Sequence, residues 1–293
     1  MSQDPKQPHE KGHPGTTGHS WDGIEELNNP LPRWWLWTFY ATIIWGIAYT
    51  IAYPAWPLIS GATPGVLGYS TRAELRKDIA EFDAKNHALK TGLEAADLST
   101  LTPGTPLYDF AANAGAAVFR ANCSQCHGAG AAGAKGYPNL LDDDWLWGGD
   151  VESILTTVSH GVRNTTDPDA QLGAGPMPAF GRDKLLEAPQ IEAVVEHVLS
   201  ISGQAHNAEL ASAGVAVFAE SCASCHGEDG TGLREFGAPN LADAITLYGG
   251  DRDSLTRTIT NGRNGVMPAW GQRLAEADVK AVALYVHQLG GGE

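Results

Sequence analysis

One sequence unit occurs twice in this chain, and it limits the fold more than any other feature. Residues 114–128 (AGAAVFRANCSQCHG) align without a gap with residues 213–227 (AGVAVFAESCASCHG), and both copies continue with Pro-Asn-Leu, Gly-Gly-Asp, Arg-Asn and Met-Pro-Ala-aromatic. A chain of 293 residues is long enough for about two domains. The duplication therefore predicts two tandem domains of one fold, at 112–204 and 205–293.

Each copy contains a Cys-x-x-Cys-His motif, and the chain has no other cysteine. This motif is typical of covalent haem c attachment, because each thiol adds to one porphyrin vinyl group and the adjacent histidine reaches the iron. The two copies predict two covalently bound haem c groups in class I-like cytochrome c domains. The attachment residues are Cys123, Cys126, Cys222 and Cys225, and the proximal iron ligands are His127 and His226.

A zinc site made from all four cysteines is one alternative, and a redox dithiol is another. Zinc ribbons place their cysteine pairs roughly 15 to 20 residues apart and need no histidine after each pair. The two pairs in this chain are much farther apart in sequence, and no alternation of strands and helices surrounds them. Haem attachment is therefore favoured.

Counting the methionines limits the candidates for the sixth iron ligands, because the chain has only three methionines and one is the initiator. Met177 and Met267 remain, each in a Met-Pro-Ala-aromatic loop downstream of a haem motif. A thioether ligand favours ferrous iron and raises the reduction potential. We expect one methionine per copy, so that Met177 serves the first haem and Met267 the second.

The first copy carries about ten extra residues, around Thr165–Pro176, before its methionine. His160 precedes this insertion, and its counterpart in the second copy is Asn261. His160 is therefore an alternative sixth ligand for the first haem. His197 aligns instead with Tyr285 of the second closing helix, so we expect a packing role for it.

Small and apolar residues predict how each domain packs. Gly115 and Phe119, like Gly214 and Phe218, lie one turn apart on the helix that leads into a haem motif. A closing helix with an apolar stripe ends each copy. The stripes are Ile191, Val194, Val195 and Val198 in the first copy and Val279, Val282, Ala283 and Val286 in the second. We expect each glycine to let the leading and closing helices of its own copy cross closely.

Two pairs of residues are candidate donors to haem propionates. They are Trp147 and Arg163 in the first copy and Tyr248 and Arg263 in the second. Indole, phenol and guanidinium groups can all donate hydrogen bonds to a carboxylate. Core or surface roles explain these four residues equally well.

Residues 34–57 predict a membrane anchor. No Asp, Glu, Lys, Arg or His occurs from Trp34 to Thr71, and the part from Trp34 to Tyr53 is apolar and aromatic. About 20 such residues cross the hydrocarbon layer, and aromatic residues at both ends suit the two interfaces. A buried core helix is the alternative, which the lack of any charged face disfavours.

Haem chemistry predicts the topology of this single-pass chain. Haem is joined to Cys-x-x-Cys-His on the outer side of the bacterial inner membrane, so both domains are expected in the periplasm. Residues 1–33 then form a cytoplasmic tail. Its first part, Met1–Ser20, lacks apolar periodicity and predicts a disordered polar segment. The histidines His9, His13 and His19 could alternatively bind a metal there.

Residues 58–111 predict an amphipathic helix followed by a linker. Thr71 and Glu74 match a capping box, and four apolar residues follow at helical spacing. They are Leu75, Ile79, Phe82 and Leu89. This stripe would pack on a partner subunit or lie at the membrane surface.

Composition and charge exclude several classes of protein. The 43% hydrophobic and 18% charged residues exclude a disordered chain and a polytopic membrane protein. The net charge of −15 argues against a nucleic-acid partner. The acidity extends over the C-terminal two thirds and would attract a basic cytochrome c, in an association that weakens with salt.

Several segments together resemble a known family. The run Asp22–Trp35 (DGIEELNNPLPRWW), the helix end Ala52–Pro57 (AYPAWP) and the two haem motifs are similar to the dihaem subunit of cbb3-type cytochrome c oxidase, the CcoP/FixP family. The resemblance implies a mainly α fold, with one N-terminal transmembrane helix before two tandem cytochrome c domains. It also implies four axial ligands, which are His127, Met177, His226 and Met267.

The resemblance implies a relay of electrons from a donor cytochrome c to the monohaem subunit and then to the catalytic haem-copper subunit of a proton-pumping oxidase. Two six-coordinate haems leave no position for a substrate, so the chain is not expected to be an enzyme on its own. A free-standing membrane-tethered electron shuttle and a dihaem peroxidase-like enzyme are the alternatives.

Overall fold

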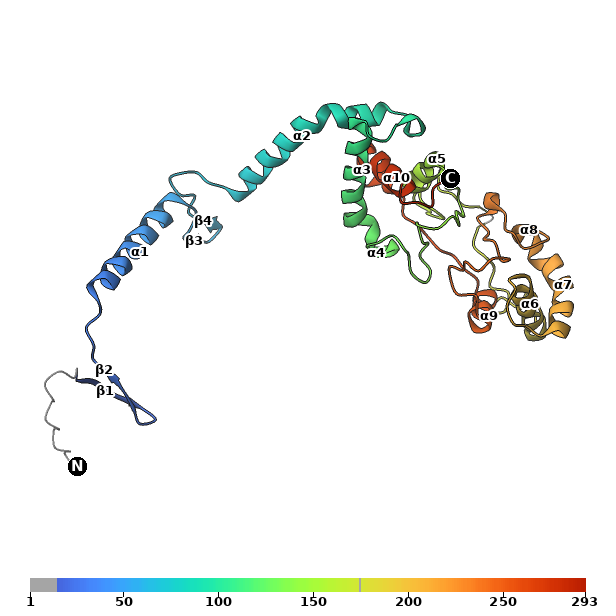
Figure 1. The fold of residues 1–293 in the computed structure, drawn as a ribbon, viewed down its shortest axis with the longest axis horizontal. Coiled ribbons are helices and arrows are strands. Elements are labelled where there is room, and N and C mark those ends of the chain that lie inside the picture. Colours follow the sequence, from blue (N-terminus) through green and yellow to red (C-terminus); the bar gives the residue numbers. More distant parts are fainter. Residues whose placement is uncertain (1–14, 174) are drawn as a thin grey trace. The chain divides into compact units, whose positions relative to one another are not determined.

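The computed structural model describes residues 15–173 and 175–293. The chain divides into two compact units, Met1–Ala84 and Lys85–Glu293, and the division falls within one long helix. Helices make up most of the regular structure (Figure 1), which confirms the predicted mainly α fold. The first unit contains the predicted anchor, and the second contains both copies of the repeat.

A β-hairpin precedes the anchor. Strands β1 (Thr16–Trp21) and β2 (Ile24–Leu27) are antiparallel and joined by Asp22-Gly23, with φ of 49° and 84°. Two positive φ values match the twist of paired strands, and Asp-Gly is a favoured sequence for such a loop. The predicted disordered segment is therefore wrong where it overlaps β1. The rest of that prediction, with His9 and His13, lies outside the described residues.

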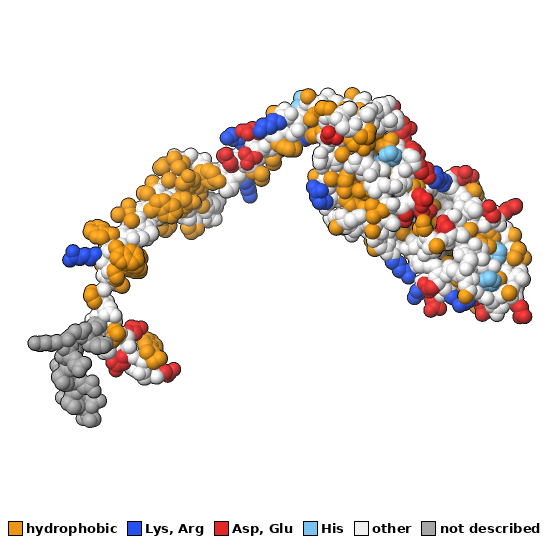
Figure 2. Space-filling model, viewed as in Figure 1, with side chains coloured by type: hydrophobic (Ala, Val, Ile, Leu, Met, Phe, Trp, Pro, Cys, Tyr) orange, Lys and Arg blue, Asp and Glu red, His pale blue; other side chains and the backbone are white. Residues whose placement is uncertain are grey.

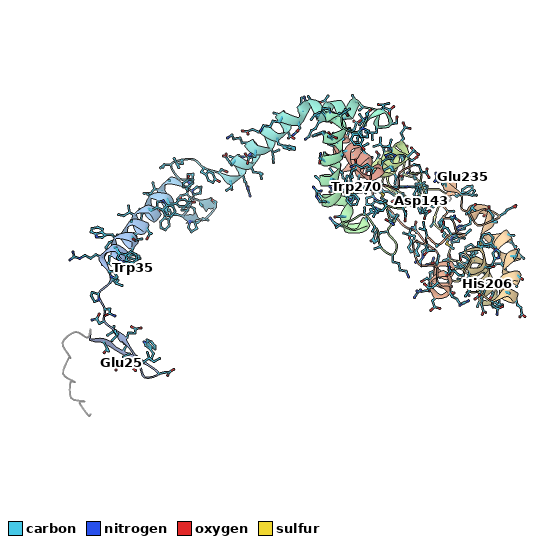
Figure 3. All side chains as sticks on the ribbon, viewed as in Figure 1. Glu25, Trp35, Asp143, His206, Glu235 and Trp270 are labelled. Carbon is cyan, nitrogen blue, oxygen red and sulfur yellow. The ribbon has the colours of Figure 1, made fainter. Side chains whose placement is uncertain are left out.

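Helix α1 (Arg33–Ala52) corresponds to the predicted anchor. It has 20 residues, none of them buried, and it is long and apolar enough to cross a membrane. Hydrophobic side chains cover most of its visible face (Figure 2), and Trp35 projects from its first turn (Figure 3). The helix stops before Pro54, as a proline disfavours helical backbone in the residue before it.

The segment after α1 folds back onto its end. Strands β3 (Pro57–Leu58) and β4 (Gly61–Ala62) form a short antiparallel hairpin. The amide of Val66 then donates to the carbonyl oxygen of Ile51 at 2.9 Å. This bond satisfies one of the carbonyl groups that a helix end leaves without an intrahelical partner.

Helix α2 (Thr71–Ala95) is the predicted amphipathic helix. The hydroxyl of Ser70 accepts a hydrogen bond from the amide of Ala73 at 3.3 Å, so the cap lies one residue before the predicted Thr71. Leu75 is 59% exposed, whereas Leu93 near the other end is buried. The apolar stripe is therefore packed only at the end that belongs to the second unit.

The second unit contains corresponding helices in its two copies. The first copy has α3 (Pro106–Val118), the π-helical turn η2 (Phe119–Cys123), α4 (Ser124–His127), α5 (Val151–His160) and α6 (Ala188–Ile201), preceded by η1 (Leu98–Thr100). The second copy has α7 (Ala208–Ser221), α8 (Ala223–His226), η3 (Arg234–Phe236), α9 (Arg252–Asn261), η4 (Trp270–Gln272) and α10 (Glu276–His287).

The repeated Gly-Gly-Asp motif caps the middle helix of each copy. The carboxylate of Asp150 accepts from the amide of Ser153 at 2.9 Å, and that of Asp251 accepts from the amide of Ser254 at 2.9 Å. Side-chain and backbone hydrogen bonds from these serines lower the pKa of both carboxyls. The N-termini of α5 and α9 therefore receive an ionised acceptor.

The leading and closing helices pair across the copies. Helix α3 packs along α10, and α6 packs along α7. A Cβ on Gly115 of α3 would lie 2.1 Å from the carbonyl oxygen of Ala281 in α10, and one on Gly214 of α7 would lie 2.1 Å from that of Ala193 in α6. The predicted close crossings at glycine are therefore confirmed, but their partners are exchanged.

Two apolar cores result from this exchange. The first core combines α3 and α5 with α10, and the second combines α6 with α7 and α9. The ring of Phe119 lies 5.6 Å from that of Tyr285, and the ring of His197 lies 5.0 Å from that of Phe218. The packing role of His197 is confirmed. The boundary expected after residue 204 divides the sequence copies, whereas each core contains helices from both.

A fragment of residues 205–293 should not form a stable domain, because it lacks α6 and therefore the buried partner of α7. A fragment of residues 85–293 retains both cores and should unfold cooperatively. Circular dichroism during thermal unfolding of the two fragments measures the difference. A cooperative transition of the shorter fragment at the temperature of the longer one would contradict the exchanged packing.

Candidate haem sites

Each haem motif lies where a long helix passes into a short one. In the first copy α3 continues through η2 into α4, and in the second copy α7 is followed directly by α8. Gly128 and Gly227 end the short helices with φ of 80° and 79°, which glycine adopts without steric cost. The four cysteines form no disulfide with one another. Both motifs therefore present two thiols and an imidazole from one tight turn.

The two motif histidines are oriented by backbone carbonyl groups. Nδ1 of His127 lies 3.0 Å from the carbonyl oxygen of Pro138, and Nδ1 of His226 lies 3.0 Å from that of Pro239. A proton on Nδ1 donates to that oxygen and leaves Nε2 free to bind a metal. Burial lowers the pKa of both histidines, so each imidazole is neutral at neutral pH.

The repeated Pro-Asn-Leu segment forms the loop that supplies these carbonyl groups, a role the sequence comparison did not reveal. Asn139 and Asn240 each accept a hydrogen bond from the amide two residues on, at 3.0 and 2.8 Å. Such side-chain turns fix the backbone of a loop. The repetition of the segment was the available signal, because identical residues beside both haem motifs indicate a shared local role.

The cysteines lie in two separate environments. Cys123 packs against the first core and Cys222 against the second. Burial raises the pKa of both thiols to about 11, so they are neutral at neutral pH. Within residues 15–173 and 175–293, the motif cysteines and histidines form no group of three compact enough for one ion. This geometry does not support the alternative zinc site.

The two methionines pack opposite to the expected pairing. Met267 packs against the first core, as Cys123 does, and Met177 packs against the second core, as Cys222 does. Each methionine loop directly precedes a closing helix. Because that helix packs against the leading helix of the other copy, the loop lies at the same core. The packing therefore favours Met267 for the first motif and Met177 for the second, and the assignment of each methionine to a haem stays a prediction.

Backbone pairing joins each methionine loop to the middle of the other copy. The amide of Met267 donates to the carbonyl of Val162 at 3.0 Å, and the amide of Val162 donates back at 3.1 Å. Met177 and Arg263 make the corresponding two bonds, at 2.9 and 3.3 Å. Two reciprocal hydrogen bonds therefore fix each methionine backbone.

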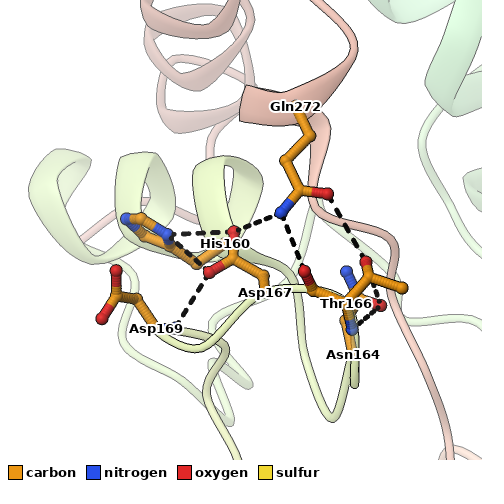
Figure 4. A network of polar contacts seen from close by, with 6 residues as sticks. All are labelled: His160, Asn164, Thr166, Asp167, Asp169 and Gln272. Atoms are coloured by element: carbon orange, nitrogen blue, oxygen red, sulfur yellow. Dashed lines mark hydrogen bonds and ion pairs between the residues drawn. The ribbon is translucent and has the colours of Figure 1, made fainter.

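His160 contacts a carboxylate. Its Nδ1 lies 3.3 Å from both carboxylate oxygens of Asp167 (Figure 4). Together with Asp169 they form a group whose ligand atoms lie within 4.8 Å of one another. This contact occupies Nδ1 and leaves Nε2 free, so His160 stays the predicted alternative to Met177 as a sixth ligand.

The four candidate propionate donors form two ring–guanidinium pairs. The guanidinium carbon of Arg163 lies 5.4 Å from the ring centre of Trp147, and that of Arg263 lies 4.2 Å from the ring centre of Tyr248. Both distances suit a cation–π contact. In each copy, the two residues predicted to donate to haem propionates therefore lie in contact with each other.

Protein acceptors engage part of each guanidinium group. Arg163 donates from Nε to the carbonyl of Gly175 at 3.1 Å and from Nη2 to that of Gly237 at 3.3 Å. Arg263 donates from Nε and Nη2 to the hydroxyl of Thr258, at 3.1 and 2.7 Å. A guanidinium group has five N–H donors, so these bonds leave others for a further acceptor.

Comparison with known proteins establishes the family. Residues 13–60 match the family model of the N-terminal domain of cytochrome oxidase-cbb3, FixP. Residues 110–198 and 209–286 each match the model of cytochrome c oxidase, cbb3-type, subunit III. The chain belongs to the cbb3-type oxidase subunit III family. The resemblance seen in the N-terminal run and the haem motifs is thus confirmed.

Relatives match this subunit III chain over almost its full length. A Cereibacter sphaeroides protein named cbb3-type cytochrome c oxidase subunit CcoP is 62% identical over 282 residues, 96% of this chain and 97% of the relative. A Rhodobacter capsulatus protein of the same name is 57% identical and covers 98% and 99% of the two chains. The subunit FixP of Azorhizobium caulinodans is 50% identical and covers 96% and 95%.

Two glycine variants can test the contact between the Met267 loop and α5. Gly161 has φ of 74°, and a Cβ there would lie 2.3 Å from the carbonyl oxygen of Met267. Gly203 has φ of 70° with nothing within 4 Å of such a Cβ. Gly203→Ala should lower the free energy of unfolding by about 1 kcal/mol through left-handed strain, whereas Gly161→Ala should lower it by about 2 to 4 kcal/mol because the loop must also move. Urea denaturation measures both, and equal losses would contradict the contact.

Proposed function

We propose that this chain is the electron-relay subunit of a cbb3-type oxidase. It would carry electrons from a donor cytochrome c toward the monohaem cytochrome c subunit and the catalytic haem-copper subunit. One observation carries the proposal: each core joins a Cys-x-x-Cys-His motif to one methionine. The relatives are named as subunits of cbb3-type oxidases, which supports the same role.

The donor sets fit two covalently bound haem c groups. Haem c supplies one-electron transfer when bound. The proposed attachment residues are Cys123 and Cys126 for the first group and Cys222 and Cys225 for the second. The proposed axial ligands are His127 with Met267, and His226 with Met177. The crosswise assignment rests on each methionine packing against the core that also contacts the cysteine of the other copy.

The residues around each site support electron transfer without bond chemistry. An imidazole and a thioether would together hold each iron, which would leave no position for a substrate. A dihaem peroxidase would require one methionine to leave its place, and the two reciprocal backbone bonds at Met177 and at Met267 oppose this movement. We therefore propose that the chain is not an enzyme on its own.

Arg163 and Arg263 are the proposed propionate donors, with Trp147 and Tyr248 beside them. The planar guanidinium fork matches a carboxylate, and each group has N–H donors beyond those that the protein acceptors use. Burial lowers the pKa of Arg163, yet a guanidinium remains charged at neutral pH. The contacts with the aromatic rings would fix the orientation of both guanidinium groups.

We propose that α1 crosses the bacterial inner membrane once, with the N-terminus in the cytoplasm and the haem domains in the periplasm. Its 20 residues and the absence of buried positions along it support contact with lipid. The attachment of haem c on the outer side of the membrane supports this orientation.

An acidic surface supports a basic cytochrome c as the donor. Burial, followed by repulsion from Asp243, Asp142 and Asp143, raises the pKa of Asp144, so these carboxyls lie close together. Asp and Glu side chains are also numerous on the visible face of the second unit (Figure 2). Such a field accelerates association with a cationic protein, and salt weakens it.

The crosswise ligation can be tested in a chain that carries one haem. Cys222→Ala with Cys225→Ala should leave only the haem joined at Cys123, as mass measurement would report. Adding Met267→Ala should lower the midpoint potential of that haem, because a thioether stabilises the ferrous state. Adding Met177→Ala is the matched control and should leave the potential unchanged. The reverse pattern in a redox titration would mean ligation within each copy.

Purification in mild detergent should yield this chain together with a haem-copper subunit and a monohaem cytochrome c subunit. Mass identification of the purified sample, with the haem spectrum of the same sample, tests the relay. A lone protein with two low-spin haems would favour the tethered shuttle. High-spin iron assigned to this chain would favour the peroxidase-like enzyme.

A further inference from the structure

The insertion of the first copy folds against the segment that holds Met267. The amide of Arg163 donates to the carbonyl of Gln171 at 2.9 Å, and the amide of Gln171 donates to the carbonyl of Gly161 at 3.1 Å. Gln171 thus pairs with one side of Val162, while Met267 pairs with the other side. The side chain of Gln171 also donates to the hydroxyl of Thr157 in α5 at 2.6 Å. The insertion therefore adds a third stretch of backbone beside the pair that fixes Met267.

The same insertion also contacts the chain just after Met267. Gln272 ends η4, and its Nε2 donates to the carbonyl of Thr166 at 3.1 Å and to the carboxylate of Asp167 at 3.4 Å (Figure 4). The Thr166 hydroxyl lies 3.5 Å from Oε1 of Gln272. We call Thr166, Asp167 and Gln171 the clamp. It contacts the Met267 loop at two places, through Val162 on one side and Gln272 on the other.

Asp167 is the most firmly placed member of the clamp. Its side chain is only 8% exposed, and its carboxylate accepts from the amide of Asp169 at 2.9 Å. His160, the last residue of α5, lies 3.3 Å from the same carboxylate. Because α5 packs in the first core, these bonds connect Gln272 to the core that contains Cys123.

The second copy has no counterpart of the clamp. Only three residues separate Arg263 from Met267, and Asn261 occupies the position of His160. Arg182 occupies the position of Gln272, five residues after Met177, and its Nε donates to the neighbouring Asp183 at 3.2 Å in an exposed pair. The Met177 loop is held instead by backbone bonds to α9, in which the amides of Phe180 and Arg182 donate to the carbonyls of Ile259 and Thr260 at 3.0 and 2.9 Å. The two methionine loops are therefore held by different kinds of contact.

We propose that the clamp positions the Met267 thioether, so that the first haem site retains its sixth ligand. This inference rests on the proposed function, because it requires Met267 to be an axial ligand. Thr166, Asp167, Gln171 and Gln272 are positioning residues, and none of them touches the iron. The clamp accounts for the insertion in one copy alone.

Ligand exchange at the ferric haems measures this retention in the detergent-purified full chain. Cyanide can bind only after the methionine leaves, so its binding rate reports the opening of each loop. Gln272→Ala should raise the rate at the first site about fivefold, the factor expected for one lost hydrogen bond. The rate at the second site should not change. Arg182→Ala is the matched control and should leave both rates unchanged.

A double-mutant cycle separates positioning from the charge of Asp167. Asp167→Ala should also raise the rate at the first site, and combining it with Gln272→Ala should add less than the sum of the two effects, because they share a bond. Asp167→Asn keeps an acceptor for Gln272 and should leave most of the retention intact. A rate that increases as much with Asp167→Asn as with Asp167→Ala would overturn the positioning role.

The clamp and the proposed ligation can fail separately. Met267→Ala should open the first site to cyanide, whatever the clamp does. If Met267→Ala opens the first site and Gln272→Ala does not change the rate of cyanide binding there, Met267 is a ligand but the clamp does not position it. If Met267→Ala opens the second site instead, the crosswise ligation is wrong. Gln272 is exposed, so its substitution should preserve the fold, and circular dichroism of each variant checks this.

Discussion

The contact on which both haem sites depend is the crossing of two helix backbones at a glycine. At Gly115 and at Gly214 the carbonyl of the partner helix occupies the space of a side chain. Because a protein interior is close-packed and has no room to absorb the clash, a side chain at either glycine would displace a whole helix. Each methionine loop lies just before one of these partner helices. The crossings therefore determine which methionine packs against which core.

The exchange of helices makes one folded body from two sequence copies. The loops between the helices also contact each other across the copies: a Cβ on Gly237 would lie 2.3 Å from the ring of Trp147, and one on Gly136 would lie 3.3 Å from that of Tyr248. Because each core contains helices from both copies, the chain passes repeatedly between the two cores. Two sites linked in this way keep their relative placement better than two domains on a flexible linker.

Local structure could be predicted from the sequence because it depends on neighbouring residues, whereas the pairing of helices could not. Helices α6 and α10 present the same kind of apolar stripe, so periodicity alone does not decide which one crosses α3. The useful signal was the connection at 202–207, since so short a loop makes α6 and α7 adjacent. The hairpin at β1 had a signal too, in Asp22-Gly23. The carbonyl groups of Pro138 and Pro239 accept from the motif histidines, and only the repetition of the Pro-Asn-Leu segment pointed to this role.

The proposed clamp has a consequence for the reduction potential of the site that would hold Met267. A thioether stabilises ferrous iron only while it is bound, so a methionine that leaves less often would keep the potential of its site higher. In the proposed ligation Met267 serves the motif at Cys123, so the clamp would raise the potential of that site. Because the insertion occurs in one copy alone, a duplicated pair of sites would then differ in how each methionine is held.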